Sequence, residues 1–307
     1  MNIKDVIPLI KKTFSEWSEH KVGRLAAALA YYTIFSIPPL LIIAVAIAGQ
    51  VFGQEVAQDR IVAQLSSLIG ADSAEALQTM LANASHPGES IVAAIFGVII
   101  LLFGASGVFG QLQDALNTIW EVTPRPGRGI LGMIKDRFFS FTMVLGVSFL
   151  LLVSLLISTA LATVGEFISG LLPSLTILAQ LINLLISLGA VTVVFALIFK
   201  VVPDVEVAWR DVGVGAAVTA VLFVVGQFAI GLYLGNSDFT STYGAAGALV
   251  VILLWVFFSA QILFLGAEFT QVYANMYGSR IVPSENAVPV TKEAREKEGI
   301  PPETPEE

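Results

Sequence analysis

Six long apolar segments with almost no charge constrain this sequence more than any other feature. A helix needs about 20 apolar residues to cross the hydrocarbon core of a bilayer, and each segment reaches that length. Only 13% of the 307 residues are charged, whereas about 25% is usual in soluble domains. The sequence therefore predicts an all-α, polytopic membrane bundle of six transmembrane helices. The predicted spans are residues 26–49, 91–113, 138–163, 177–200, 211–235 and 244–272.

The basic residues predict the orientation of this bundle. Of the 16 Lys and Arg residues, all except Arg60 lie before the first span, in the second and fourth connections, or after the last span. Lys and Arg are enriched in the cytoplasmic loops of membrane proteins. Both termini are therefore expected in the cytoplasm.

The segments outside the spans define the remaining domains. Near the N-terminus, Ile7, Ile10 and Phe14 share one helical face, as in a helix that lies in the membrane interface; a helix packed beneath the bundle is the alternative. The C-terminal residues are rich in Pro, Glu and Lys and lack the apolar content to fold alone. The predicted domains are a cytoplasmic interfacial amphipathic helix at 1–24, a transmembrane domain at 25–278 with an outer helical loop at 50–90, and a disordered cytoplasmic tail at 279–307.

Two adjacent prolines, Pro38 and Pro39, lie near the middle of the first span. Each lacks a backbone N–H and presses against the carbonyl four residues earlier, so the carbonyls of Ile34 and Phe35 lose their helical partners. Lipid offers no hydrogen bonds, so this backbone must face protein or water. The pair therefore predicts a broken first helix, which either borders a cavity or forms a structural kink.

The end of the second span carries small and polar residues at helical spacing. Gly107, Gly110, Asp114, Asn117 and Glu121 fall on one helical face. Glycines let a neighbouring helix approach closely, and ionisable residues at membrane depth usually face the protein interior or water. This face predicts either a functional polar site or a helix that simply projects beyond the membrane.

The last two spans add further polar residues toward the same side. A polar vestibule open to the cytoplasm would hydrate these groups, and Gly213 is expected to provide a close-packing face on the fifth span. The predicted candidates for binding a substrate or an ion are Asp114, Asn117, Glu121, Glu268, Gln271, Gln261, Arg210 and Arg24.

The sequence offers little for metal or covalent chemistry. It has no cysteine, which excludes disulfides, iron–sulfur clusters and thiolate metal sites. His20 and His86 are the only imidazoles, and they are expected in different compartments. No metal site and no cofactor are therefore predicted. No nucleophile–base–orienter set is visible, so the chain is not expected to be an enzyme.

The sequence resembles the YihY/virulence factor BrkB family of bacterial inner-membrane proteins. The resemblance covers roughly residues 5–280 and implies a six-helix protein of the inner membrane with no established substrate. Family members were long labelled ribonuclease BN, but the sequence shows no pattern of a metal-ligand cluster and no extended basic surface for RNA phosphates. The matching stretches are 26-AAALAYYTIFSIPPLL-41, 105-ASGVFGQLQDALNTIWEV-122, 203-PDVEVAWRDVGVGAA-217 and 243-YGAAGALVVILLWVFFSAQILFLGAEFTQVYA-274.

Two functions are compatible with these features. The first is a transporter or flippase-like protein for a lipid or amphiphilic solute, whose buried acids bind a cation, a proton or a headgroup. The alternative is a structural or assembly factor of the cell envelope that transports nothing. Membrane lipids are the expected partners, together with an amphiphilic or lipid-linked substrate, and no nucleic acid is expected. The glycine face of the second span packs either within the chain or in a homo-oligomer.

Overall fold

The computed structural model describes a mostly helical chain. The third predicted span and most of the second lie outside the described residues. The other four predicted spans are confirmed as helices. The number of membrane crossings stays a prediction. The described residues are 3–70, 73–75, 77–79, 107–125, 176–235 and 245–291. Their helices are α1 (Ile3–Glu19), α2 (Val22–Phe52), α3 (Gln54–Ile69), α7 (Thr176–Val201), α8 (Trp209–Gly235) and α10 (Ala245–Tyr277), and residues 107–119 are also helical.

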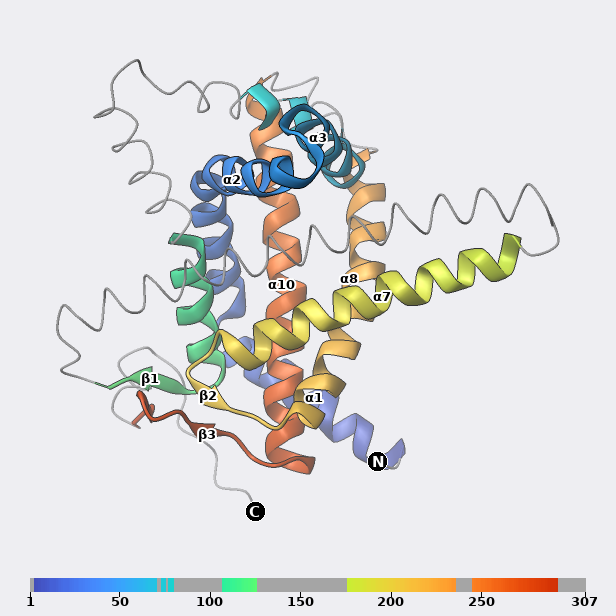
Figure 1. Ribbon diagram of the computed structural model, residues 1–307. Helices are drawn as coiled ribbons and strands as arrows, with labels where there is room; N and C mark the ends of the chain where they lie inside the picture. The colour runs from blue at the N-terminus through green and yellow to red at the C-terminus, as the bar shows by residue number, and fades with distance from the viewer. Residues whose placement is uncertain are drawn as a thin grey trace.

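The long helix α10 runs through the middle of the described structure and packs against α1, α2 and α8 (Figure 1). Helix α7 crosses the bundle at a steep angle and packs against α8. Two short sheets lie at one end of the bundle, here called the sheet end, and α3 lies at the other. The main group of buried side chains gathers toward the sheet end, with Leu116, Phe199, Val212 and Phe264 among its most buried members.

The surface of the bundle is strongly apolar. Within the described residues, Trp209–Tyr233 and Gly247–Tyr277 are long and apolar enough to cross a membrane, and α2 and α7 contain shorter apolar helices. Phe228 on α8 is 71% exposed and Val225 is 63% exposed. Large apolar surfaces of this kind mark contacts with membranes or partner proteins. The surface therefore supports a membrane location, and the direction of the helices across it stays a prediction.

Helix α2 corrects the expected break at Pro38 and Pro39. The helix is continuous from Val22 to Phe52, although Figure 1 shows its upper part turning away from its lower part. Pro38 and Pro39 thus lie within one bent helix and do not divide it into two separate helices. The Thr33 hydroxyl donates to the carbonyl of Leu29 at 2.7 Å, not to a carbonyl freed by a proline. The side chains of both prolines lie outside what the structure describes, so the cavity beside them stays a prediction.

The N-terminal helix and the outer loop agree with the sequence in part. Helix α1 packs against α10 with Leu9 and Thr13 buried, while Ile7 and Phe14 form an exposed apolar edge. This edge is compatible with the expected membrane interface. In the outer loop expected at 50–90, α3 is present and residues 73–75 and 77–79 are also helical, while most of the remaining loop lies outside the described residues.

The chain after α10 is ordered as far as residue 291, which corrects the expected disordered tail from residue 279. Strand β4 (Ala287–Pro289) pairs antiparallel with β1 (Val122–Pro124), and β3 (Val282–Pro283) pairs antiparallel with β2 (Val205–Glu206). Ala287 is buried in the main core. These short strands also modify the expected all-α fold. Residues 292–307 lie outside the described part.

A hydrogen-bond network closes the sheet end. Asn117 donates through Nδ2 to the Asp204 carboxylate at 3.0 Å and accepts from the Asp204 backbone N–H at 2.8 Å. Asp211, at the start of α8, accepts from the backbone N–H and the hydroxyl of Ser279, both at 2.8 Å. Buried polar groups need such partners because each unsatisfied one costs about 1–3 kcal/mol. The connections between the helices are therefore held by side chains as well as by strands.

Glycines make the closest contact between α8 and α10. A Cβ at Gly215 would overlap Thr270, and a Cβ at Gly266 would overlap Thr219, so each helix inserts a threonine against a glycine of the other. Each threonine hydroxyl also donates to its own helix, Thr219 to Gly215 and Thr270 to Gly266. Small residues at four-residue spacing allow this close packing.

The glycines that the sequence predicts as close-packing residues do not make this close contact. Among the described residues, nothing is within 4 Å of a Cβ placed at Gly110 or Gly213. Gly107 makes only ordinary contact, with its Cβ position 3.5 Å from Tyr32. The contact expected of Gly213 is thus made two residues later, by Gly215.

We predict that Gly215→Ala lowers the apparent unfolding temperature in detergent, because overpacking a tight contact costs about 1–3 kcal/mol. Gly213→Ala is the matched control on the same helix. It should leave the temperature unchanged or raise it slightly, since Ala is about 1 kcal/mol better than Gly in a helix interior. Equal effects of the two substitutions would contradict the described seam.

We also predict that the two strands after α10 stabilise the fold. A chain ending after residue 280 loses β3 and β4 and should unfold at a lower temperature, because each lost hydrogen bond costs about 0.5–1.5 kcal/mol. A chain ending after residue 291 keeps both strands and should unfold like the full chain. Identical thermal unfolding of the two truncated chains would show that the strands contribute nothing.

Candidate functional site

The site is centred on His20, which lies in the turn between α1 and α2. Lys21 adopts a left-handed backbone conformation with φ of 53° and begins the reversal into α2. The backbone N–H of His20 still donates to the carbonyl of Glu16 at 2.8 Å. His20 is therefore positioned by the last turn of α1. The His20 side chain is fully buried, with 0% exposure. A buried imidazole requires hydrogen-bond partners.

Glu268 of α10 is the first of these partners. Its Oε1 lies 2.8 Å from His20 Nδ1, and its side chain is also 0% exposed. The Glu268 Oε2 has no hydrogen-bond partner among the residues that the structure describes. The carboxylate lies within the apolar stretch Gly247–Tyr277, where an ionisable residue is expensive and usually functional.

Glu121 approaches the opposite side of the ring, with Oε1 3.4 Å from His20 Nε2. It follows the helical residues 107–119 and has a φ of 55°, a left-handed conformation that costs a non-glycine residue about 1–2 kcal/mol. Its carbonyl accepts from the Val290 backbone N–H at 2.9 Å. The pairing of β1 with β4 thus helps to fix the residue that carries this carboxylate.

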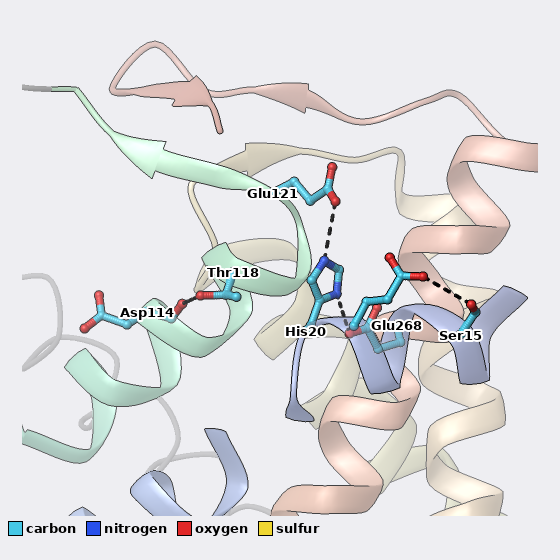
Figure 2. A network of polar contacts seen from close by, with 7 residues as sticks. Ser15, His20, Asp114, Thr118, Glu121 and Glu268 are labelled. Carbon is cyan, nitrogen blue, oxygen red and sulfur yellow. Dashed lines mark hydrogen bonds and ion pairs between the residues drawn. The ribbon is translucent and has the colours of Figure 1, made fainter. Parts of the chain in front are cut away.

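Glu16 completes the site from one helical turn before His20. Ligand atoms of Glu16, His20 and Glu121 all lie within 4.8 Å of one another. Figure 2 shows His20 between Glu121 and Glu268, with chain segments from three parts of the sequence meeting at the ring. We call Glu16, His20, Glu121 and Glu268 the His20 cluster.

The surroundings of the cluster shift the pKa values of His20 and Glu16, which lie outside the predicted membrane-spanning helices. Burial opposes the charged imidazole, but the hydrogen bonds and charges of Glu121 and Glu268 outweigh it and raise the pKa of His20 from 6.5 to about 10. Burial also raises the pKa of Glu16. The raised pKa favours the protonated, cationic form of His20 at neutral pH.

The sequence predicted some of this site and missed its centre. Glu121 and Glu268, both predicted candidates, are brought together, whereas His20 was set aside because the only other histidine is distant. The spacing of Glu16 and His20, which places both on one face of α1, was the available signal. It becomes informative only when the segments carrying Glu121 and Glu268 are known to meet there.

The other predicted site residues lie outside the His20 cluster. Asn117 and Gln271 are buried, and Asn117 binds Asp204 as described above. Asp114 is exposed, and in Figure 2 its carboxylate points away from His20. Arg210 and Arg24 are exposed. Gln261 lies on α10 with its amide nitrogen 3.8 Å from a Cβ placed at Gly23.

We predict a pH-dependent stability that depends on His20. A raised pKa means that the stabilisation is fully present below about pH 6.5 and is lost as the pH rises through about 10. In detergent with a chelator, the wild type should unfold at higher temperature than His20→Gln near pH 6.5. The corresponding difference in the free energy of unfolding should be on the order of a few kcal/mol. This difference should shrink toward pH 10. A gap that stays constant across this range would contradict the charged imidazole.

Comparisons with known proteins place this chain among membrane proteins. A family model described as Virulence factor BrkB matches residues 13–291, a region that contains the whole His20 cluster. A UPF0761 membrane protein of Ralstonia nicotianae is 26% identical over 268 residues, which cover 87% of this chain and 58% of that protein. A UPF0761 membrane protein of Teredinibacter turnerae is 28% identical over 277 residues, covering 88% of this chain and 61% of that protein.

A third relative, from Mannheimia succiniciproducens, is also named a UPF0761 membrane protein. It is 27% identical over 276 residues, covering 86% of this chain and 88% of that protein. The chain thus spans about three fifths of the length of the first two relatives and most of the third. No solved structure matches it.

Proposed function

Because this chain belongs to the Virulence factor BrkB family and is an integral membrane protein, we propose that it is a transporter. In this proposal it is a multi-pass protein of the bacterial inner membrane with both termini in the cytoplasm. It moves a lipid or an amphiphilic solute in a flippase-like manner. The observation that carries the proposal is the fully buried Glu268 on a membrane helix, bound to a histidine from another segment.

A buried ionic contact often gives a fold little more stability than apolar packing would, although removing one partner is costly. Removing two charges from water costs several kcal/mol per ion, and their attraction often does no more than offset that cost. Such contacts are therefore candidates for positions where a protein changes between arrangements, and ionisable residues inside membranes often mark ion or substrate pathways. The contact between His20 and Glu268 has this character.

The cluster is well placed to couple movements of separate segments. It joins the turn between α1 and α2, the end of the helix containing residues 107–119, and α10 (Figure 2). Transporters commonly move one group of helices against another around a binding site inside the membrane. Breaking and reforming the His20 cluster would allow the N-terminal segment and the second span to move relative to α10.

The proposed class of cargo is compatible with the apolar surface of the helices. Exposed apolar side chains cover α8, and Tyr31 and Phe35 are exposed on α2. An amphiphile would keep its hydrocarbon part along such surfaces while its polar part passes the polar residues near the sheet end. In the proposed orientation, the sheet end faces the cytoplasm.

Flux into proteoliposomes tests this function. Purified protein is reconstituted with a fluorescent phospholipid or lysophospholipid, and translocation is followed by chemical quenching of the label on one side. Wild-type vesicles should translocate at least one probe faster than protein-free vesicles. Glu268→Gln should reduce the translocation rate by about tenfold or more. Loss of about 1.4 kcal/mol of interaction in the rate-limiting state is enough for a factor of ten.

Two variants serve as controls for the flux measurement. Glu206→Gln removes an exposed carboxylate of β2 at the sheet end and should translocate like the wild type. Asp114→Asn tests the exposed acid outside the cluster. Loss of flux in Asp114→Asn with full flux in Glu268→Gln would move the site away from the His20 cluster.

A non-transporting assembly factor is the second candidate. The observation that favours it is the closed sheet end, where β-pairing and the bonds of Asp204 and Asp211 hold the connections in one arrangement. Translocation equal to that of protein-free vesicles for both probes would contradict transport and support this scaffold.

A further inference from the structure

Three groups of the His20 cluster have the composition of a metal site. His20 contributes an imidazole nitrogen, and Glu16 and Glu121 contribute carboxylate oxygens, all within 4.8 Å of one another. Glu16 and His20 lie one helical turn apart, so their side chains leave α1 on the same face. The set is more than a group of surface acids, because its central member is a fully buried imidazole.

The distance between His20 Nε2 and Glu121 Oε1 is long for a direct ion pair and is also compatible with two ligands of one ion. Charge-assisted N–H···O hydrogen bonds are usually about 2.7–2.9 Å long, but Nε2 and Oε1 are 3.4 Å apart. In a tetrahedral site with bonds of about 2.0–2.2 Å, neighbouring ligand atoms lie about 3.4 Å from each other. Small rotations of the Glu16 side chain would bring its oxygen to the same ion.

The contact between His20 Nδ1 and Glu268 resembles the hydrogen bond that orients many metal-binding histidines. A ligating imidazole almost always donates its second N–H to a carboxylate, a carbonyl or water. Glu268 Oε1 lies 2.8 Å from Nδ1, so Nε2 is the ring nitrogen that remains for an ion on the side of Glu121.

We propose that Glu16, His20 and Glu121 bind a divalent transition-metal ion, of the class of Zn²⁺ or Mn²⁺, and that Glu268 positions His20 for this role. Imidazole ligands suit zinc and related ions, and carboxylates suit harder ions such as manganese. The imidazole makes Mg²⁺ a poorer fit, since that ion prefers oxygen ligands and retains several waters. Three protein ligands leave one coordination position for water.

The ion would connect the end of α1 to the segment that follows residues 107–119. This connection replaces the proton on Nε2, so metal binding should weaken as the pH falls and protons compete for the ligands. The site does not depend on the proposed transport, and its test requires no cargo.

The test measures metal binding by the full chain in detergent. The protein is stripped with a chelator, dialysed against Zn²⁺, Mn²⁺ or Mg²⁺, and assayed for bound metal by mass spectrometry and for thermal unfolding. The wild type should retain one Zn²⁺ or Mn²⁺ per chain with micromolar or tighter affinity and unfold at higher temperature with the ion. Glu16→Gln and Glu121→Gln should each weaken binding by at least about tenfold.

Two further variants separate the roles of neighbouring residues. Glu268→Gln should weaken binding by about 10–100-fold through loss of the group that orients His20, without changing the stoichiometry at saturation. Glu19→Gln alters the residue next to His20 and should bind like the wild type. All variants are compared for unfolding temperature and monodispersity in chelator, and Glu16→Gln, at a half-buried position, keeps the test decisive if a His20 variant does not fold.

Two results would overturn the proposal. One is a wild-type protein that retains neither Zn²⁺ nor Mn²⁺ after dialysis. The other is equal retention by the wild type, Glu16→Gln and Glu121→Gln, which would place the bound ion elsewhere on the chain.

Discussion

The buried contact between His20 and Glu268 governs how the N-terminal segment can sit in this structure. A lone carboxylate within an apolar helix is so costly that it needs a partner inside the protein. The partner comes from the turn after α1, so this turn must lie against α10. Helix α1 then packs along α10, and near its first turn the Tyr277 hydroxyl donates to the Asp5 carbonyl at 3.3 Å. The ionic contact thus fixes one end of an amphipathic helix whose length is held by packing against α10.

Two kinds of contact hold the segments of the bundle together. The sheet end combines short strands, the bonds of Asp204 and Asp211, and the His20 cluster. Along α8 and α10 the contact is instead made by small residues, with Gly215 and Gly266 receiving threonines. Polar bonds specify one arrangement, whereas small-residue contacts depend on close approach alone. In the proposed transporter, the sheet end is where a change of charge would alter the arrangement.

The sequence was most informative where a single helix decides the outcome. The expected spans at 211–235 and 244–272 agree closely with α8 and α10, because length and apolar content are properties of one segment. Glu121 and Glu268 could also be recognised, since an acid in an apolar stretch is conspicuous without any knowledge of its partner.

Features that depend on distant segments could not be read from the sequence in the same way. The strands near Ala287 lie in a stretch whose composition is typical of disorder, and they form because partners from before α7 and α8 are already in place. Gly213 and Gly215 are equivalent as residues, and only the position of α10 decides which of them is crowded. His20 was missed for the same reason, because its three carboxylates come from separate parts of the chain.

The state of the His20 ring tests the central contact most directly. Only two histidines are present, so ¹⁵N-histidine labelling of a His86→Gln variant leaves one imidazole to observe by NMR. In metal-free detergent, both ring nitrogens should be protonated at neutral pH, with titration near the pKa of about 10 and a lower pKa after Glu268→Gln. A ring that titrates near 6.5 and does not respond to Glu268→Gln would contradict the account.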